Sequence, residues 1–432
     1  MNHAERREME SVLINRGMNP SKESPDLEIV HTCSVTGQAA AKSRNAIRRA
    51  AKNGRHVFVT GCFTGTDLEV ARELGDTVVT QAGETPMLQR FAHEVDKWLE
   101  RPHEETIKTT TTSLPIATLP TRLGEHTRAE LRIQDGCDAH CTFCIIPKIR
   151  TTLRSKTIED TVREATRLVE LGHKEIVFTG VFIGAYGHET ALRRNQSNSE
   201  GEYLAELLDT VSQIEGLKRL RISSMEPGDV TPVLLDAMVA NRNVVVPHLH
   251  LPLQSGSDAV LRKMNRQYTI TQYQEMIAMV NERLNVDGVP PAITTDVICG
   301  FPTETEDDFE KTIEIASWVG YLHMHIFPYS VRSGTAAARW KQLPPEVLKE
   351  RVHRLIDLDT TLSSAYRSLL IGRTVQVMLE QPASESGQLK GRCEYYAEIT
   401  VPSKERFGTI VEAKVMQVLG DKTVAVRTLQ IL

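Results

Sequence analysis

The sequence predicts an α/β protein with three folded parts: a small parallel α/β domain, a central partial (β/α)6 barrel and a small C-terminal β-barrel. Strand-like and helical runs alternate through most of the chain, which indicates parallel sheets with crossover helices. The C-terminal residues instead alternate apolar and polar side chains, a pattern typical of antiparallel strands. A length of 432 residues is enough for several buried cores.

The N-terminal domain is expected over residues 1–100. Short β-branched runs at 28–35 and 56–62 flank a helical run at 39–52, which is a β-α-β pattern with a crossover. Residues 101–122 are rich in threonine and lack apolar periodicity, so they are predicted to form an extended linker.

The partial barrel is expected over residues 123–343. Helical patterns, for example 158–171 and 308–319, separate most of the strand-like runs. The runs lie at 130–137, 174–181, 220–227, 248–255, 293–300 and 323–330. Six such units are fewer than the eight of a complete (β/α)8 barrel, and active sites of barrel folds form at the C-terminal strand ends.

A connecting helix and a small barrel complete the predicted fold. Residues 344–370 form a long, charged, amphipathic pattern, which predicts one helix. Residues 371–432 alternate in polarity and contain a Gly-Asp turn at 420–421, which predicts a small β-barrel.

Composition excludes several classes of protein. Hydrophobic residues make up 40% and charged residues 25%, as in a globular protein. No stretch approaches the roughly 18 apolar residues of a membrane span, so we expect a cytoplasmic protein without a membrane partner. Seven cysteines without a signal peptide indicate thiols that bind metal, react or pack. The net charge of −5 gives no global signature of nucleic-acid binding.

The most specific motif is Cys137-x3-Cys141-x2-Cys144, directly after a predicted strand. Three thiolates leave one coordination position open on a tetrahedral zinc or on a cubane cluster, which implies a substrate or cofactor as the remaining ligand. The alternatives are three buried cysteines, or a zinc site completed by His140. The spacing and the position at a strand end favour the open metal site.

At these residues the sequence resembles the radical S-adenosylmethionine (SAM) superfamily, and within it the methylthiotransferase family. The family's strand-end motifs are matched in order by DGC-x3-CTFCIIP, TGVFIGAYG, RISSMEP, LPLQSGSD, LRKMNRQYT, TDVICGFPTET and HIFPYSVRSGT. The resemblance implies a [4Fe-4S] cluster held by Cys137, Cys141 and Cys144, with SAM on the fourth iron. It implies cleavage of SAM to a 5′-deoxyadenosyl radical by an electron from a donor such as a flavodoxin-type protein. It also implies an N-terminal methylthiotransferase domain and a C-terminal TRAM domain that grips RNA.

The resemblance also implies a set of residues around SAM. The glycine and the loop after it would approach the methionine moiety, the two adjacent serines and the glutamate would face the ribose or amino group, and the others would complete the rim. These residues are Gly180, Ser223, Ser224, Glu226, Gln254, Ser255 and Tyr329. Any one of them is equally explained as a strand-end turn residue or a helix cap.

Cys33 and Cys62 follow two predicted parallel strands, so both thiols are expected at one edge of the sheet. Two small buried hydrophobic residues are the alternative. In the family, three cysteines of this domain hold an auxiliary [4Fe-4S] cluster that supplies or carries the transferred sulfur. The first belongs to a Gly-Cys-x-x-Asn stretch whose asparagine matches Asn2, so that cysteine is expected to precede Met1. The chain is then expected to be truncated at its start, or to be a remnant with an incomplete ligand set.

Two further departures from the family pattern are His31, where asparagine is usual, and Thr303, where glycine is usual. Neither removes an evident ligand. Cys299 and Cys393 lack metal-like spacing and are expected to pack in the interior.

Local basic patches are the candidates for RNA contact. Residues 39–66 contain basic but no acidic side chains, and a second patch follows the cysteine motif. The candidates are Lys42, Arg44, Arg48 and Arg49, then Lys148, Arg150 and Arg154 with Lys156 beside them, and Arg373 and Arg392 in the TRAM-like tail. A solvated helix face explains a charge run equally well, and the TRAM-like tail favours RNA.

The finer resemblance is to the MtaB-like branch, on the stretch CSVTGQAAAKSR at 33–44 together with RISSMEP and HLHLPLQSGSD. That branch transfers a methylthio group to C2 of N6-threonylcarbamoyladenosine beside the tRNA anticodon, so the expected partner is tRNA. Two alternatives stay open: a methylthiotransferase acting on N6-isopentenyladenosine in tRNA, and a non-catalytic RNA-binding remnant without a complete auxiliary cluster.

Overall fold

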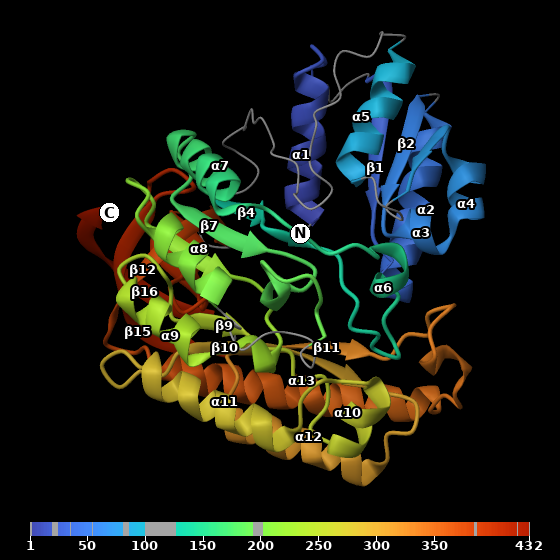
Figure 1. Ribbon diagram of the computed structural model, residues 1–432. Helices are drawn as coiled ribbons and strands as arrows, with labels where there is room; N and C mark the ends of the chain where they lie inside the picture. The colour runs from blue at the N-terminus through green and yellow to red at the C-terminus, as the bar shows by residue number, and fades with distance from the viewer. Residues whose placement is uncertain are drawn as a thin grey trace.

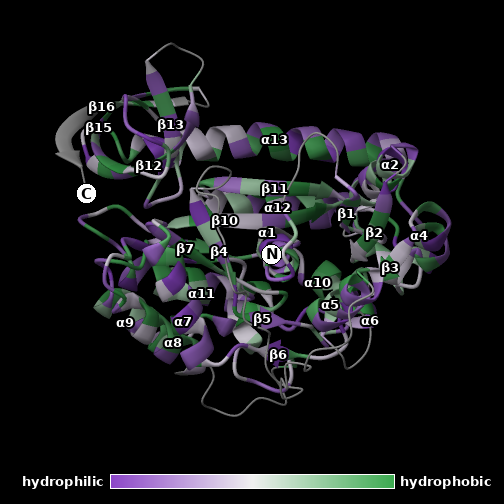
Figure 2. Ribbon diagram, turned by 90° about the horizontal axis from the view of Figure 1, so that it is seen from above, coloured by the Kyte–Doolittle hydropathy of each residue, from purple (hydrophilic) through white to green (hydrophobic). Residues whose placement is uncertain are grey.

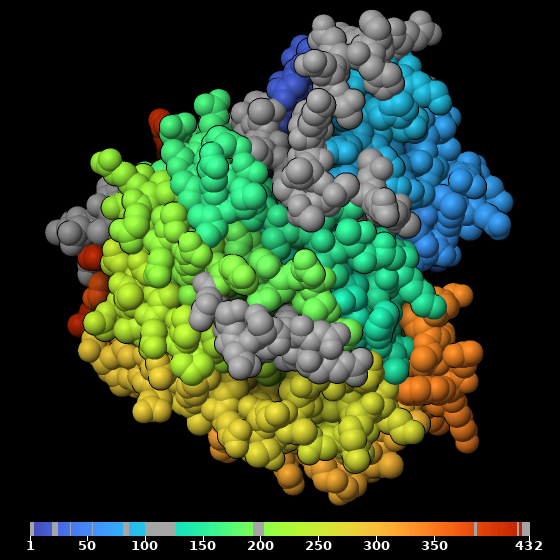
Figure 3. Space-filling view, in the orientation of Figure 1, coloured from blue at the N-terminus to red at the C-terminus, as the bar shows by residue number. Residues whose placement is uncertain are grey.

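The computed structural model describes residues 2–19, 25–34, 36–53, 55–80, 86–99, 127–192, 202–383, 387–420 and 422–431. The predicted linker at 101–122 lies outside these ranges. Figure 1 shows a small α/β domain beside a larger core, with a β-barrel at the C-terminal end. In the space-filling view the N-terminal domain lies directly against the core (Figure 3).

The N-terminal domain is a parallel sheet between helices. Its strands are β1 (Leu27–Thr32), β2 (His56–Gly61) and β3 (Thr77–Val79), in the order β1-β2-β3. Its helices are α1 (Asn2–Ile14), α2 (Gly37–Lys52), α3 (Phe63–Thr66), α4 (Leu68–Leu74) and α5 (Met87–Trp98). Successive residues of β2 face opposite sides, so Val57 and Val59 pack with α2 while Phe58 packs with α1 and α5. The predicted β-α-β unit is confirmed, and α1 is an addition to it.

Six parallel strands form the core in chain order. They are β4 (Arg128–Arg132), β7 (Glu175–Thr179), β8 (Arg219–Ile222), β9 (His248–His250), β10 (Ala292–Cys299) and β11 (His323–Pro328). Two three-stranded sheets, β4-β7-β8 and β9-β10-β11, are joined by the parallel bridges Leu220–Val245 and Ser224–His250. This confirms the predicted partial (β/α)6 barrel.

Helices cover the outer face of this sheet. They are α7 (Ile158–Glu170), α8 (Glu202–Ser212), α9 (Pro232–Ala240), α10 (Asp258–Met264), α11 (Ile270–Arg283) and α12 (Glu306–Val319). Shorter elements lie near the strand ends: β5 (Gln134–Asp135), β6 (Arg154–Ser155) and α6 (Ile146–Ile149). One continuous apolar core joins the strands to the helices and includes Leu131, Phe178 and Leu249.

The predicted connecting helix is α13 (Pro345–Ser368), which packs along β11 and reaches the C-terminal barrel. Hydrophilic and hydrophobic residues alternate along it (Figure 2), as expected for a helix with one buried side. The closed barrel has the order β12-β13-β14-β16-β15, which confirms the sequence prediction. Its strands are β12 (Thr374–Pro382), β13 (Gln388–Cys393), β14 (Glu398–Pro402), β15 (Ile410–Leu419) and β16 (Lys422–Ile431). Among the described residues, no helix has the length and apolarity to cross a membrane.

Candidate active site

The three clustered cysteines lie on one loop between β5 and α6. Gly136, which begins the loop, has a φ of +84°, and a Cβ there would lie 2.1 Å from the carbonyl oxygen of Thr152. Only glycine fits this turn. The Ala139 N–H donates to Cys137 Sγ at 3.4 Å, and the Cys144 N–H donates to the Cys141 carbonyl at 3.1 Å. All three cysteines therefore stand on one hydrogen-bonded loop.

Arg266, which follows α10, joins this loop to a carboxylate. Its Nη1 donates to Cys141 Sγ at 3.3 Å, and its Nη2 lies 2.8 Å from Glu226 Oε1. The guanidinium lies 5.3 Å from the ring centroid of Tyr268, whose hydroxyl donates to backbone carbonyls at 2.9–3.0 Å. Burial lowers the pKa of Arg266, but Glu226 outweighs it, so the pKa is raised well above its ordinary value and the group is always charged.

The donor set fits the cofactors that the resemblance implies. Three thiols occupy all but one position of a cubane cluster, and metal binding displaces their protons even though burial raises the pKa of Cys137 and Cys144 to about 12. Glu226 Oε2 is buried and has no hydrogen-bond partner among the described residues. A free acceptor this near the loop suits the amino group of an amino-acid ligand such as SAM.

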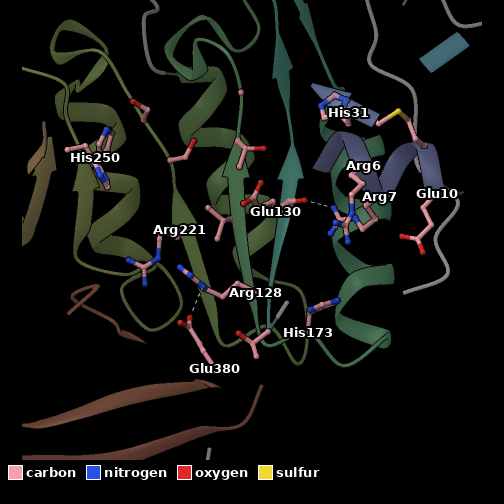
Figure 4. A pocket seen from close by; sticks show the side chains of 18 of the residues that line it. Arg6, Arg7, Glu10, His31, Arg128, Glu130, His173, Arg221, His250 and Glu380 are labelled. Carbon is pink, nitrogen blue, oxygen red and sulfur yellow. Dashed lines mark hydrogen bonds and ion pairs between the residues drawn. The ribbon is translucent and has the colours of Figure 1, made fainter. Parts of the chain in front are cut away.

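A cavity of about 1480 Å³ opens beside these strand ends, between the N-terminal domain, the open side of the core and the C-terminal barrel. Gly180, Ser223 and Ser224 line it, and their contact with SAM stays a prediction. Figure 4 shows arginines from α1 on one side of the cavity and Arg221 and His250 on the other. The volume exceeds what a single small ligand needs, so the cavity has room for a cofactor and a nucleoside.

The remaining predicted rim residues differ in position. Ser255 has no exposed surface, and its Oγ accepts from the Ser257 N–H at 3.3 Å, so the prediction that it contacts SAM is wrong: it orders the start of α10. Gln254 is 9% exposed and takes a left-handed φ of +58°. The Tyr329 ring packs edge-on against Phe301 at 5.5 Å, and its buried hydroxyl has no partner in the described structure.

Cys33 and Cys62 follow β1 and β2, which are neighbouring parallel strands with Thr32 opposite Gly61. This confirms that both follow strands at the same sheet edge. Burial raises the pKa of the Cys62 thiol. Its side chain packs against Ile145 and Ile149, directly after the cysteine loop. The two cysteine groups thus lie on elements in contact.

The donor set at this second site is incomplete. The described residues bring two thiols here, where the resemblance implies three for an auxiliary cluster. Cys62 Sγ instead accepts from Arg150 Nη2 at 3.8 Å. Two thiols beside a guanidinium do not fit a complete cluster site.

Arg150 is not an RNA contact, contrary to the prediction. It is 4% exposed, and its Nη1 lies 2.7 Å from Glu5 and 2.6 Å from Asp135. The prediction that Arg154 contacts RNA is also wrong, because Arg154 is only 7% exposed on β6, which pairs with β5. Charge runs in the sequence do not distinguish a surface patch from cations that neutralise buried carboxylates, and α1 supplies such carboxylates here.

Of the same patch, Lys156 is buried in an ion pair with Glu164, whereas Lys148 is exposed and donates to the Gly334 carbonyl. In the tail, Arg373 Nη2 donates to the Asp287 carbonyl at 2.7 Å. Lys148 and Arg373 therefore stay predicted RNA contacts.

The basic residues of α2 form an exposed, positively charged surface. Lys42, Arg48 and Arg49 line a groove of about 950 Å³ that also contains Cys33. Arg44 differs, because its guanidinium lies 5.9 Å from the ring centroid of Phe63. A cationic groove beside a thiol suits a polyanion brought to that thiol.

Two expectations about isolated cysteines are confirmed, since Cys299 and Cys393 are 1% and 0% exposed within apolar cores. Sequence reasoning missed Arg266, which stands in the quoted motif LRKMNRQYT but carries no spacing signal of its own. It also missed the groups that line the cavity floor, Arg128, Arg221 and Tyr396, which come from three distant segments.

Known proteins resemble the chain in both sequence and fold. The pattern of the Radical SAM superfamily matches residues 131–316, and that of the Uncharacterized protein family UPF0004 matches residues 1–81. Threonylcarbamoyladenosine tRNA methylthiotransferase MtaB of Bacillus subtilis (strain 168) is 33% identical, over 92% of this chain and 86% of the relative. The tRNA-2-methylthio-N(6)-dimethylallyladenosine synthase of Desulfitobacterium hafniense (strain Y51) is also 33% identical, over 90% and 86%.

Among solved structures, the radical S-adenosylmethionine methyltransferase TsrM from Kitasatospora setae shares the fold. The TM-score is 0.54 at 13% sequence identity, and the match covers 73% of this chain and 66% of that one. The superfamily uses a [4Fe-4S] cluster and SAM, which the cysteine loop and Glu226 fit. The chain belongs to the radical SAM methylthiotransferase family, and it is an enzyme of this type.

Proposed function

We propose that the enzyme transfers a methylthio group to C2 of N6-threonylcarbamoyladenosine in tRNA. The observation that carries the choice of nucleoside is the presence of arginines in the cavity. Arg128 and Arg221 line it, beside aliphatic side chains such as Leu13 and Ile29. An isopentenyl group is apolar and needs an apolar wall, whereas a threonylcarbamoyl group carries a carboxylate that these cations can bind.

In this proposal Cys137, Cys141 and Cys144 hold the cluster, and Glu226 binds the amino group of SAM. When bound, these cofactors supply the one-electron chemistry that activates an unreactive C–H bond. The protein's part is to orient the cofactor through Arg266, to admit the nucleoside past Gly180 and to exclude water from the cavity.

The proposal assigns residues 1–100 to the methylthiotransferase domain, 123–343 to the catalytic core and 371–432 to a TRAM domain, with 101–122 and 344–370 as connections. tRNA is the partner, and its phosphates bind the α2 groove lined by Lys42 and Arg49. The electron comes from a donor such as a flavodoxin-type protein. Cys33 and Cys62 are the residues through which this chain engages the sulfur to be transferred.

The test is mass spectrometry of tRNA nucleosides from a deletion strain, complemented with the wild-type gene or with a Cys137→Ala gene. We expect the methylthio form of threonylcarbamoyladenosine to disappear on deletion and to return only with the wild-type gene. Loss of the methylthio-isopentenyl form alone would assign the enzyme to the other nucleoside. An unchanged nucleoside profile would contradict the proposed transfer and support a non-catalytic RNA-binding protein.

The cluster assignment has its own test. Iron and sulfide are quantified anaerobically in the purified wild-type protein and in a variant with Cys137, Cys141 and Cys144 replaced by alanine. We expect the variant to lose about four irons, the content of one cubane cluster. Equal iron content in both proteins contradicts the assignment.

A further inference from the structure

The ring of Tyr396 lies under three guanidinium groups where the C-terminal barrel meets the core. The guanidinium carbons of Arg392, Arg221 and Arg128 lie 4.4, 4.9 and 5.5 Å from its ring centroid. The three arginines come from β13, β8 and β4. One aromatic ring therefore contacts three cations, one from the C-terminal barrel and two from the core. These cations repel one another, and a bound anion would reduce that repulsion.

Tyr396 is held rigidly in this position. Its φ is +68°, a left-handed conformation that costs a non-glycine residue about 1 kcal/mol or more. Its N–H donates to the Cys393 carbonyl at 2.9 Å, and its ring stacks on the imidazole of His248 at 4.5 Å. His248 in turn bonds the hydroxyl of Thr294 at 3.1 Å. Such strain is kept where surrounding structure enforces it, commonly at ligand sites.

The nearby carboxylates leave two of the arginines with donors to offer. Arg221 makes the most protein contacts of the three, with Nε 3.0 Å from Glu175 and its Nη atoms 3.4 and 3.5 Å from backbone carbonyls. Arg128 has Nε 2.9 Å from Glu380, and Arg392 donates through Nη1 to the Tyr396 carbonyl at 3.1 Å. Since a guanidinium has five N–H donors, Arg128 and Arg392 retain several.

The balance of charge around the ring is positive. Glu380 is paired with Arg128 and Glu175 with Arg221, whereas Arg392 has no ion pair among the described contacts. His248 adds no charge, because burial and then Arg221 hold its pKa well below its ordinary value. An additional carboxylate is thus electrostatically favoured beside Arg128 and Arg392.

Three members of the cluster line the cavity already described, namely Arg128, Arg221 and Tyr396, beside Ser223 and Ser224. Arg392 adjoins the cavity through the Tyr396 ring, whose centroid is 4.4 Å from its guanidinium carbon. Arg221 lies on β8, and Ser223 follows directly after that strand, two residues or about 7 Å further along the chain. A nucleoside with its base at the strand ends can therefore extend its N6 substituent towards the arginines.

We propose that Arg128 and Arg392, held over the ring of Tyr396, bind the carboxylate of the threonylcarbamoyl substituent and so select the nucleoside. This inference rests on the proposed function and gives the C-terminal barrel a second task, because Arg392 and Tyr396 then form part of the substrate pocket. An isopentenyl group is rejected, since it would desolvate these guanidinium groups without pairing them. A backbone phosphate is the other oxyanion of RNA, and the test separates the two.

The test measures the affinity of the full-length reconstituted protein for three anticodon stem-loop RNAs. Position 37 carries threonylcarbamoyladenosine, its carboxyl methyl ester or unmodified adenosine. We expect the wild type to bind the first RNA about 10-fold to 100-fold more tightly than the other two, the range for one charge-assisted interaction. Arg128→Gln and Arg392→Gln should each abolish most of this difference, measured as the ratio of the affinities for the modified and the unmodified RNA.

Arg163→Gln is the matched control, because Arg163 is 53% exposed on α7 and pairs only with neighbours on its own helix among the described contacts. Arg392→Gln guards against misfolding of the Arg128 variant, and the melting temperature is recorded for each protein. If both variants keep the wild-type preference, the assignment is overturned while the proposed function stands. Equal loss of affinity for all three RNAs identifies a phosphate contact and also overturns it. A wild type without any preference contradicts the proposed nucleoside itself.

Discussion

Replacing Arg266 by glutamine tests how the protein positions its cofactor. Arg266 makes two charge-assisted contacts, to Cys141 Sγ at 3.3 Å and to Glu226 Oε1 at 2.8 Å. Glutamine keeps the approximate length but removes the charge and the planar fork. Glu226 then remains buried with one weakened partner and with the other oxygen already free.

The magnitude follows from these contacts. A hydrogen bond to a charged group contributes about 1.5–3 kcal/mol, which corresponds to about 10-fold to 150-fold in binding. Arg266 orients Glu226 but is not a ligand of the cluster. We therefore expect the dissociation constant of SAM to rise by that factor, while the iron content stays near that of the wild type. Equilibrium dialysis with labelled SAM and anaerobic iron analysis measure the two quantities separately.

The matched control is Arg262→Gln, because Arg262 is exposed on α10, four residues earlier, and its Nε donates only to a backbone carbonyl in the described contacts. Arg266→Lys keeps the charge without the fork and should be intermediate. An Arg266→Gln protein that binds SAM within two-fold of the wild type, at equal iron content, would refute this role for Arg266.

Other predictions concern stability and RNA binding. Thr303 has a φ of +85°, which strains a non-glycine backbone, so Thr303→Gly should raise the free energy of unfolding by about 1 kcal/mol in denaturant titrations. A lower free energy of unfolding would show that the backbone at Thr303 is not strained. Burial raises the pKa of Glu304 to about 7, above the 4.5 of an unperturbed carboxyl, so its stabilising contribution is complete below pH 4.5 and lost as the pH rises to about 7. That loss amounts to about 3 kcal/mol at most, and Glu304→Gln should flatten this part of the curve of stability against pH. Arg150→Gln should destabilise the protein by about 3 kcal/mol, because it removes the nearest cation of buried Glu5 and leaves Arg132 to pair with both Glu5 and Asp135, with melting curves as the readout. Lys42→Gln with Arg49→Gln should instead leave the melting temperature unchanged and reduce the slope of log affinity for tRNA against log salt by about 1.4–1.8, and an unchanged slope removes the α2 groove from the RNA interface.

The order of strands and the cysteine loop could be predicted because both depend on local pattern. Periodicity placed all six core strands, and the spacing of Cys137, Cys141 and Cys144 indicated an open metal site. Partners far apart in sequence could not be found this way. Nothing in the spacing brings Arg266 to Glu226, or Tyr396 to Arg128, since those contacts exist only after the barrel forms.

The exposure of basic residues could not be predicted from the sequence either. Lys42 and Arg150 look alike in a charge profile, yet one is exposed in a groove and the other is 4% exposed. The difference is set by α1, which carries Glu5 and Glu8 to the core. The sequence departure at Thr303 was visible, but its consequence, a strained left-handed residue, appears only in the backbone.

The buried ion pairs of α1 also explain how the two cysteine groups are kept together. Glu5 and Glu8 pair with Arg132 and Arg150 at the junction of the N-terminal domain and the core, and all four side chains are nearly inaccessible. Ion pairs of this kind add little net stability, but breaking one partner costs several kcal/mol, so they tolerate little displacement. An apolar interface of the same area could slide, and Cys62, which accepts from Arg150, would then move relative to the cysteine loop. Directional charge pairing at this junction therefore fixes the distance between the two sulfur sites without any covalent link between them.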